Sequence, residues 1–108
     1  MDTDKKDGRM RELISHLAAE YLSRNSNRMS LITVTGTTLS TDRKNATIFI
    51  SVLPESEEKS ALEFAKRKRS ELREYLHDNG RFSTLPILDI VLDKGEKNRQ
   101  RIDELSRE

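Results

Sequence analysis

Apolar and polar positions alternate along the chain with two different periods, and these periods predict its secondary structure. From about Arg9 to Arg24, apolar residues recur every three or four positions and form one wide helical face. Two segments with a period of two follow, from Leu31 to Leu39 and from Ala46 to Leu53. Both are rich in β-branched residues and a short polar connection joins them, so they predict a β-hairpin.

The alternation also predicts which side chains of the hairpin face the core. In the first strand, Ile32 and Val34 are expected on one face with Gly36 in register. In the second strand, the residues expected on the core face are Ala46, Ile48, Ile50 and Val52.

A second long helix is predicted from Ser56 to about Asp78, because Ser56 is a suitable N-cap and two acidic residues follow it. Asn79-Gly80 is a typical helix stop. A third strand is predicted from Ile87 to Leu92, and a short closing helix from Arg101 to Ser106.

The order of these elements predicts an α+β fold, with a three-stranded sheet covered on one face by helices. The 108 residues fit one domain. Residues 1–8 are charged and end at a glycine, so they are expected to form a flexible arm before a domain at residues 9–106.

The second helix contains an interruption in its apolar stripe. Ala65 and Leu72 lie on the stripe, but the positions between them that should continue it, Lys68 and Arg69, are basic. A straight helix would press a charge toward the core. Either a long side chain extends out to water or the helix kinks and redirects its second half.

Charge distribution, rather than net charge, points to a binding partner. The chain carries 20 basic and 19 acidic residues, so its net charge of +1 says nothing about nucleic acid. The segment from Lys59 to Arg81, however, contains seven basic residues and only four acidic ones. The alternative is a solvated helix face, but the broken stripe favours a surface for phosphates. The candidate contacts are Lys66, Arg67, Lys68, Arg69, Arg73 and Arg81, with Arg43 and Lys44 of the hairpin loop as a weaker second set.

The chain offers little for catalysis or for a cofactor. It has no cysteine, which excludes disulfides, a thiol nucleophile and Cys-based zinc sites. His16 and His77 are expected on helix surfaces, and no catalytic or phosphate-loop motif is present. Asp89 and Asp93 share a strand face, where such acids are usually solvated. We therefore expect no enzyme, no metal, no cofactor and no small-molecule substrate.

The chain contains no apolar run of the roughly 18 to 20 residues that a membrane span needs. Its first residues also lack the apolar segment of a signal peptide. The expected location is the cytoplasm, and the expected state is a monomer.

Two segments of the predicted hairpin, Thr33 to Asp42 and Asn45 to Leu53, match a known pattern. They resemble the double-strand signature of the ribosome-binding factor A family. Further matching positions follow in the family's order: Leu72-Arg73, Leu85-Pro86, Leu88, Asp93, Arg101-Ile102 and Leu105. The resemblance spans about residues 9–106. It departs from the family pattern at Ser70, where the family has glycine, and at Arg99, where the family also has glycine.

The resemblance implies a single KH-like domain of the type II order, with a kink in its second helix. It implies binding to the small (30S) ribosomal subunit and its 16S rRNA, with a role in late maturation and 5′-end processing that is felt most in the cold. Two alternatives remain open: a generic KH-like module for single-stranded RNA, and an α+β protein-interaction domain without an RNA partner.

Overall fold

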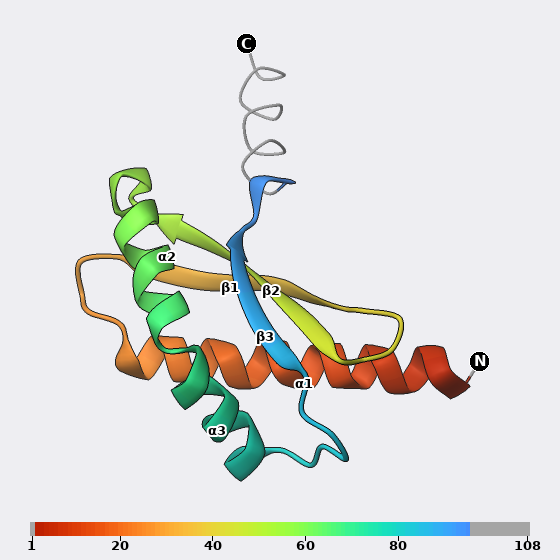
Figure 1. The fold of residues 1–108 in the computed structure, drawn as a ribbon. Coiled ribbons are helices and arrows are strands. Elements are labelled where there is room, and N and C mark those ends of the chain that lie inside the picture. The colour runs from red at the N-terminus through yellow and green to blue at the C-terminus, as the bar shows by residue number, and fades with distance from the viewer. Residues whose placement is uncertain (1, 96–108) are drawn as a thin grey trace.

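A computed structural model describes residues 2–95 of the chain, and these form helices and a three-stranded sheet (Figure 1). In chain order the elements are α1 (Asp2–Asn25), β1 (Leu31–Leu39), β2 (Asn45–Leu53), a 3-10 turn η1 (Glu55–Glu57), α2 (Glu58–Arg67), α3 (Arg69–Asn79) and β3 (Ile87–Leu92). This order confirms the α+β fold predicted from the sequence. The closing helix predicted at residues 101–106 lies outside the described residues.

The sheet has the strand order β1-β2-β3, with β2 in the centre. β1 pairs with β2 antiparallel through the predicted hairpin, and β3 pairs with β2 in parallel. A parallel pair needs a crossover connection, which α2 and α3 provide. The core face of β2 consists of the predicted residues, which are all buried: Ala46, Ile48, Ile50 and Val52.

The position predicted for Gly36 in β1 is wrong, because a bulge interrupts the strand. Val34 pairs with Ile50, but Gly36 pairs with Phe49, so the register shifts by one residue between them. A shift of one residue moves the following side chains to the opposite face of the sheet. Thr37, rather than Gly36, therefore takes the core-facing position and is 9% exposed.

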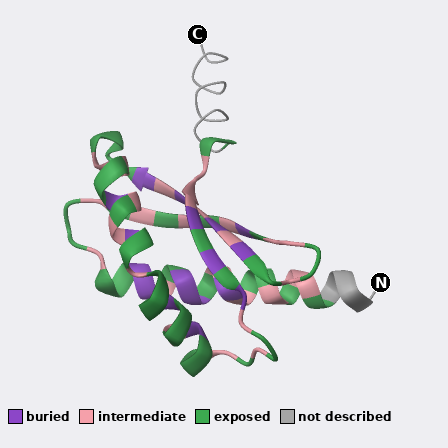
Figure 2. Ribbon diagram, viewed as in Figure 1, coloured by how far each residue is buried: buried purple, intermediate pink, exposed green. Residues whose placement is uncertain are grey.

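The helices cover one face of the sheet, as predicted, and leave the other open (Figure 2). α1 packs on β1, α2 lies against β2 and β3, and α3 contacts both β3 and α1. Leu72 and Leu76 of α3 join Ile48 and Ile90 of the sheet in one buried core. This arrangement presents the outer surfaces of α2 and α3 to solvent.

Helix α1 begins at Asp2 instead of Arg9, so residues 2–8 continue the helix and the predicted helix start is wrong. Gly8 lies inside the helix, where an added Cβ would meet only a side-chain nitrogen of Arg11 at 3.9 Å. Asp7 forms an ion pair with Arg43 of the hairpin loop. This contact between segments far apart in the sequence supports the added helical turns, and the local pattern could not reveal it.

The long helix is broken at Lys68, which confirms the kink and excludes a single straight helix. Lys68 has φ −92° and ψ 8°, and its backbone N–H lies 3.1 Å and 3.2 Å from the carbonyl oxygens of Phe64 and Ala65. This backbone conformation is open to any L-residue, so the break forms with Ser70, at the position where the sequence departs from the family that it resembles. The kink allows Ala65 before it and Leu72 after it both to be buried.

The start of the second helical stretch also differs from the prediction. Ser56 lies within the 3-10 turn, and α2 begins at Glu58 with no side-chain capping hydrogen bond. The hydroxyl of Ser60 instead donates to the backbone carbonyl and carboxylate of Glu57. The predicted stop is confirmed, because α3 ends at Asn79 and Gly80 follows in an extended conformation.

Candidate nucleic-acid interface

The break between α2 and α3 places the basic run on the surface, at the end of one helix and the start of the next. Lys66 and Arg67 are exposed in the last turn of α2. Neither side chain has a hydrogen-bond or ion-pair partner among residues 6–95. These two cations are therefore free to pair with an external anion such as a phosphate.

The other two members of the run have partners within the protein. Lys68, with its side chain 36% exposed, brings its Nζ within 3.5 Å of the Glu71 carboxylate. The Nε of Arg69 donates to the Lys66 carbonyl at 3.1 Å, and its guanidinium lies 3.6 Å from the Asp89 carboxylate. The kink thus separates the predicted run into two free cations and two that help to hold the break.

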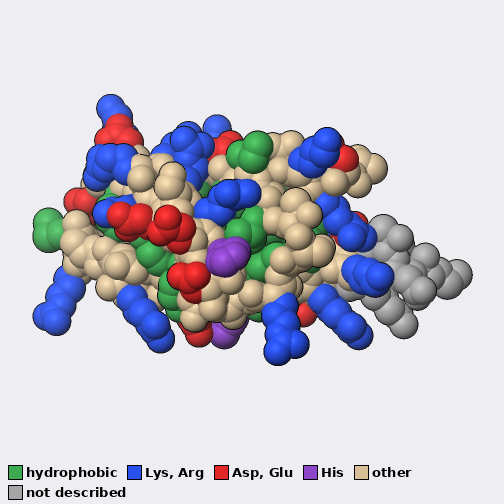
Figure 3. Space-filling model, turned by 60° about the horizontal axis from the view of Figure 1, so that its bottom comes forward, with side chains coloured by type: hydrophobic (Ala, Val, Ile, Leu, Met, Phe, Trp, Pro, Cys, Tyr) green, Lys and Arg blue, Asp and Glu red, His purple; other side chains and the backbone are tan. Residues whose placement is uncertain are grey.

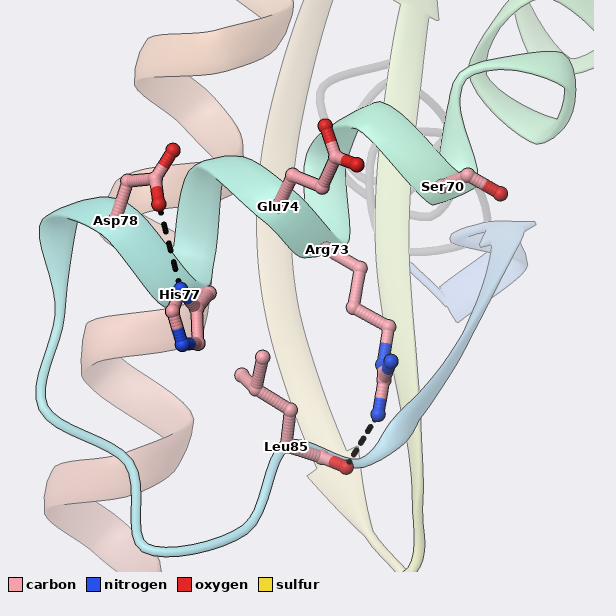
Figure 4. A pocket seen from close by; sticks show the side chains of 6 residues that line it. All are labelled: Ser70, Arg73, Glu74, His77, Asp78 and Leu85. Carbon is pink, nitrogen blue, oxygen red and sulfur yellow. Dashed lines mark hydrogen bonds and ion pairs between the residues drawn. The ribbon is translucent and has the colours of Figure 1, made fainter.

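Arg73 links α3 to the loop that precedes β3. Its Nε donates to the carbonyl oxygen of Pro86 at 3.2 Å, and a terminal nitrogen donates to that of Leu85 at 3.1 Å (Figure 4). The planar guanidinium presents these two N–H donors in a fixed geometry. They bond to carbonyl groups that precede β3 and lie outside the strand pairing. The geometry gives Arg73 a role in the fold that the sequence did not indicate.

We expect Arg73→Met to lower the free energy of unfolding by about 1 kcal/mol, because it removes two partly solvated charge-assisted hydrogen bonds and keeps the aliphatic stem. Urea denaturation measures this change. Arg67→Met is the matched control, because Arg67 is exposed and has no partner among the described side chains, so its effect should stay within roughly 0.5 kcal/mol. If both substitutions lower the free energy of unfolding by the same amount, Arg73 has no structural role of this kind.

Two tyrosine–carboxylate hydrogen bonds fasten α3 to α1. The Tyr21 hydroxyl donates to Glu71 at 2.7 Å, and the Tyr75 hydroxyl donates to Glu20 at 3.0 Å, with the two rings 5.6 Å apart. Burial, followed by the bond to Glu71, raises the pKa of Tyr21 to about 12. The same bond, followed by the charge of Lys68, lowers the pKa of Glu71. These hydrogen bonds fix the orientation of α3 relative to α1. They thereby stabilise the break between α2 and α3, at which Lys66 is exposed.

A series of shallow hollows runs along α3, between the helix and the loop before β3. The hollow in Figure 4 has a volume of about 490 Å³ and is lined by Ser70, Arg73, Glu74, His77, Asp78 and Leu85. A neighbouring hollow shares Ser70 and Arg73 with it and extends to Arg69, while another shares His77 and extends to Arg81. The hollows connect the break to Arg81, but Glu74 and Asp78 make their middle acidic.

Of the second set of predicted contacts, Arg43 and Lys44 of the hairpin loop, the structure places only Arg43 beside another predicted residue. Arg43 and Arg81 line one cavity, whereas Lys44 is exposed and does not line it. Two further basic residues line the cavity, Lys6 and Arg9 of α1, and the sequence pattern did not identify them as candidates. Their i, i+3 spacing places them on one helix face, but this signal exists only once the helix extends through residues 2–8.

Figure 3 shows how the charged side chains lie on one face of the molecule. Lysine and arginine side chains project around most of its outline, at the left-hand as well as the right-hand end, while a group of acidic side chains lies left of centre. This mixture of both signs agrees with a chain whose net charge is close to zero.

The part of the chain that the structure describes holds no group of three or more His, Cys, Asp or Glu side chains arranged for a metal ion. His16 and His77 lie on the helix surfaces, as the sequence predicts, with side chains 70% and 76% exposed. Asp89 faces Arg69, whereas Asp93 accepts a hydrogen bond from Thr35 at 2.6 Å. Within residues 2–95, no helix has the length and hydropathy to span a bilayer.

Comparison with known proteins adds evidence of relationship. The family model described as Ribosome-binding factor A matches residues 5–106. The ribosome-binding factor A of Fervidobacterium nodosum is 31% identical over 101 residues, which are 92% of this chain and 81% of the relative.

Solved structures of similar proteins share the fold. The crystal structure of ribosome-binding factor A from Thermus thermophilus matches with a TM-score of 0.71 at 22% identity, over 80% of this chain and 93% of that one. A Thermus thermophilus homology model, fitted into a cryo-EM map of a 30S complex with that factor, matches with a TM-score of 0.66 at 23% identity. It covers 76% of this chain and 89% of its own.

Proposed function

Because this chain belongs to the ribosome-binding factor A family, we propose that it binds the small ribosomal subunit and assists its maturation without catalysing a reaction. The finer role is late maturation of the 30S particle and processing of the 5′ end of 16S rRNA, with the strongest requirement in the cold. This role places the protein in the cytoplasm and requires only a monomer. The observation that carries the proposal is the family match over residues 5–106. The fitted 30S complex of the Thermus thermophilus relative is consistent with it.

The proposed contact is electrostatic and shape-dependent. A-form RNA hides its base edges in a deep and narrow groove, so proteins recognise it mainly through its backbone and shape. Lys66 and Arg67 project from the break without partners among the described side chains, and each can neutralise one phosphate and release a counterion. Arg69 and Arg73 stand beside them, and their internal hydrogen bonds position the surrounding backbone. The break thus supplies a rigid corner with two available cations.

Co-sedimentation with purified ribosomal particles tests this function. We expect the protein to pellet with free small subunits and to remain mostly in the supernatant with assembled ribosomes, because an assembly factor acts before the subunits join. Binding to short unstructured oligonucleotides as tight as that to subunits would instead favour a generic single-stranded RNA module. Absence from all particles and from RNA would favour a protein-interaction domain.

The maturation role has its own test in cells that lack the protein. At low growth temperature, primer extension on total RNA should detect 16S precursors with an extended 5′ end, and expression of the wild-type chain should remove them. Normal 5′ ends in the deficient cells would contradict the processing role while leaving subunit binding intact.

A further inference from the structure

Three segments that are distant in the sequence meet at a cavity next to the C-terminal end of α3. The break lies at the other end of this helix. α1, the hairpin loop and the segment that follows α3 all contribute to its wall. The cavity has a volume of about 270 Å³ and is lined by Lys6, Arg9, Met10, Leu13, Arg43, Arg81, Phe82, Ser83 and Thr84. We propose that this cavity is a second RNA site, which takes an unpaired nucleotide, and this inference rests on the proposed function.

The charge of the wall suits a phosphate. Four of the nine lining residues are cations, and none of the nine carries a carboxylate. Asp7 forms an ion pair with Arg43 and offsets one of the four charges. Lys6, Arg9 and Arg81 have no side-chain partner among residues 6–95, and all three are exposed. An anion in this cavity would therefore meet cations that are already close together and not engaged elsewhere.

The hairpin loop holds Arg43 in place through its backbone. Arg43 has φ 62°, the left-handed conformation that ordinary side chains adopt rarely. The loop is fixed around it, since the Arg43 N–H donates to the Ser40 carbonyl at 2.9 Å and the Lys44 N–H donates to the Asp42 carboxylate at 3.0 Å. This strained position directs the Arg43 side chain back to α1, where it pairs with Asp7 and lines the cavity.

The apolar part of the wall suits a base or sugar rather than a bare anion. Met10, Leu13 and Phe82 are half-buried and pack against the core while lining the cavity. Gly80 permits this position of the aromatic ring, because a Cβ there would lie 2.6 Å from a ring carbon of Phe82 and 3.1 Å from Leu17. Proteins that bind single-stranded RNA combine cations for the backbone with aromatic surfaces for unstacked bases.

A concave cavity favours an unpaired nucleotide over a duplex. An RNA helix presents its phosphates on a convex surface with its bases stacked inside, so a base of a duplex could not reach Phe82. The acidic residues Glu74 and Asp78 lie between this cavity and the break, which argues against one continuous phosphate track. The two basic sites are therefore separate contacts. When one site is bound to a large RNA, the other site meets the same RNA at a high effective concentration, so the overall affinity exceeds that of either site alone. Two contacts also set the orientation of the protein on the RNA.

The test compares two double variants of the full chain that remove the same charge. Lys6→Gln with Arg9→Gln alters the cavity, and Arg11→Gln with Arg28→Gln is the control, because Arg11 and Arg28 do not line it. All four side chains are exposed, so both variants should keep the wild-type unfolding midpoint. Binding is measured across a salt series to small subunits, to hexauridylate and to an RNA duplex of equal length.

We expect the cavity variant to bind small subunits about tenfold more weakly than the control variant, with a salt slope lower by about two. Its binding to hexauridylate should fall by a similar factor, and its binding to the duplex should equal that of the control. Equal behaviour of the two variants on subunits and hexauridylate overturns the inference. If wild type ignores subunits but hexauridylate binding still depends on Lys6 and Arg9, the proposed function fails and the cavity remains a nucleotide site.

Discussion

Replacing Lys66 and Arg67 together by glutamine is expected to weaken binding to small subunits by about tenfold to a hundredfold. The reason is the loss of two phosphate contacts, each of which releases a counterion when RNA binds. The logarithmic salt slope should become shallower by about two, and unfolding should be unchanged because both side chains are exposed. Titration of labelled protein with small subunits at several salt concentrations measures both quantities.

The control for this change is the variant with Arg11→Gln and Arg28→Gln, which removes the same charge from exposed side chains outside α2 and α3. Its effect should be limited to the weaker influence of net charge on association. If neutralising the break alters neither affinity nor salt slope beyond this control, Lys66 and Arg67 are solvated residues and the binding surface lies elsewhere.

Leu76→Ala is expected to lower the free energy of unfolding by about 2 to 5 kcal/mol. Leu76 is fully buried in the core, and its truncation leaves a cavity between α3, α1 and the sheet. A small domain has only about 5 to 15 kcal/mol of stability in total, so the variant should unfold at a much lower urea concentration.

Leu53→Ala is the matched control, because it makes the same chemical change at the end of β2 where the leucine is 58% exposed. Its effect should stay within roughly 0.5 kcal/mol. A loss below about 1 kcal/mol for Leu76→Ala, close to that of the control, would show that α3 does not pack in the core as described.

The two basic sites depend on different features of the fold. The break at Lys68 is held by α3, which Tyr21 and Tyr75 fasten to α1. The cavity around Arg81 is held by the hairpin loop and by the close packing at Gly80. Core variants such as Leu76→Ala should disturb both sites, whereas charge variants act on one at a time. This separation allows the two contacts to be assigned independently.

Local patterns were sufficient for two of the three strands, β2 and β3, and for the ends of several elements. The alternation in β2 predicted its buried face, because a half-covered strand places every second side chain in the core. β3 was predicted with its observed bounds, Ile87–Leu92, and Asn79-Gly80 marked the end of α3. The basic run was also visible in the sequence, as an interruption of an apolar stripe.

The sequence alone could not decide what the interruption does. An extended lysine and a kinked helix both satisfy the local pattern, and only the packing of Ala65 and Leu72 against one core selects the kink. The bulge before Gly36 escaped notice for a related reason, since it is defined by pairing with Phe49 of the next strand.

By itself, the sequence determined the α+β class, the core face of β2 and the presence of cations in the second long helix. These features follow from periodicity, which short-range geometry imposes on any chain that buries one face. The tertiary structure alone decided that Arg73 serves the fold, that α1 begins at Asp2 and that Lys6 and Arg9 join Arg43 and Arg81. Such convergence depends on contacts between residues distant in the chain, and no local period encodes them.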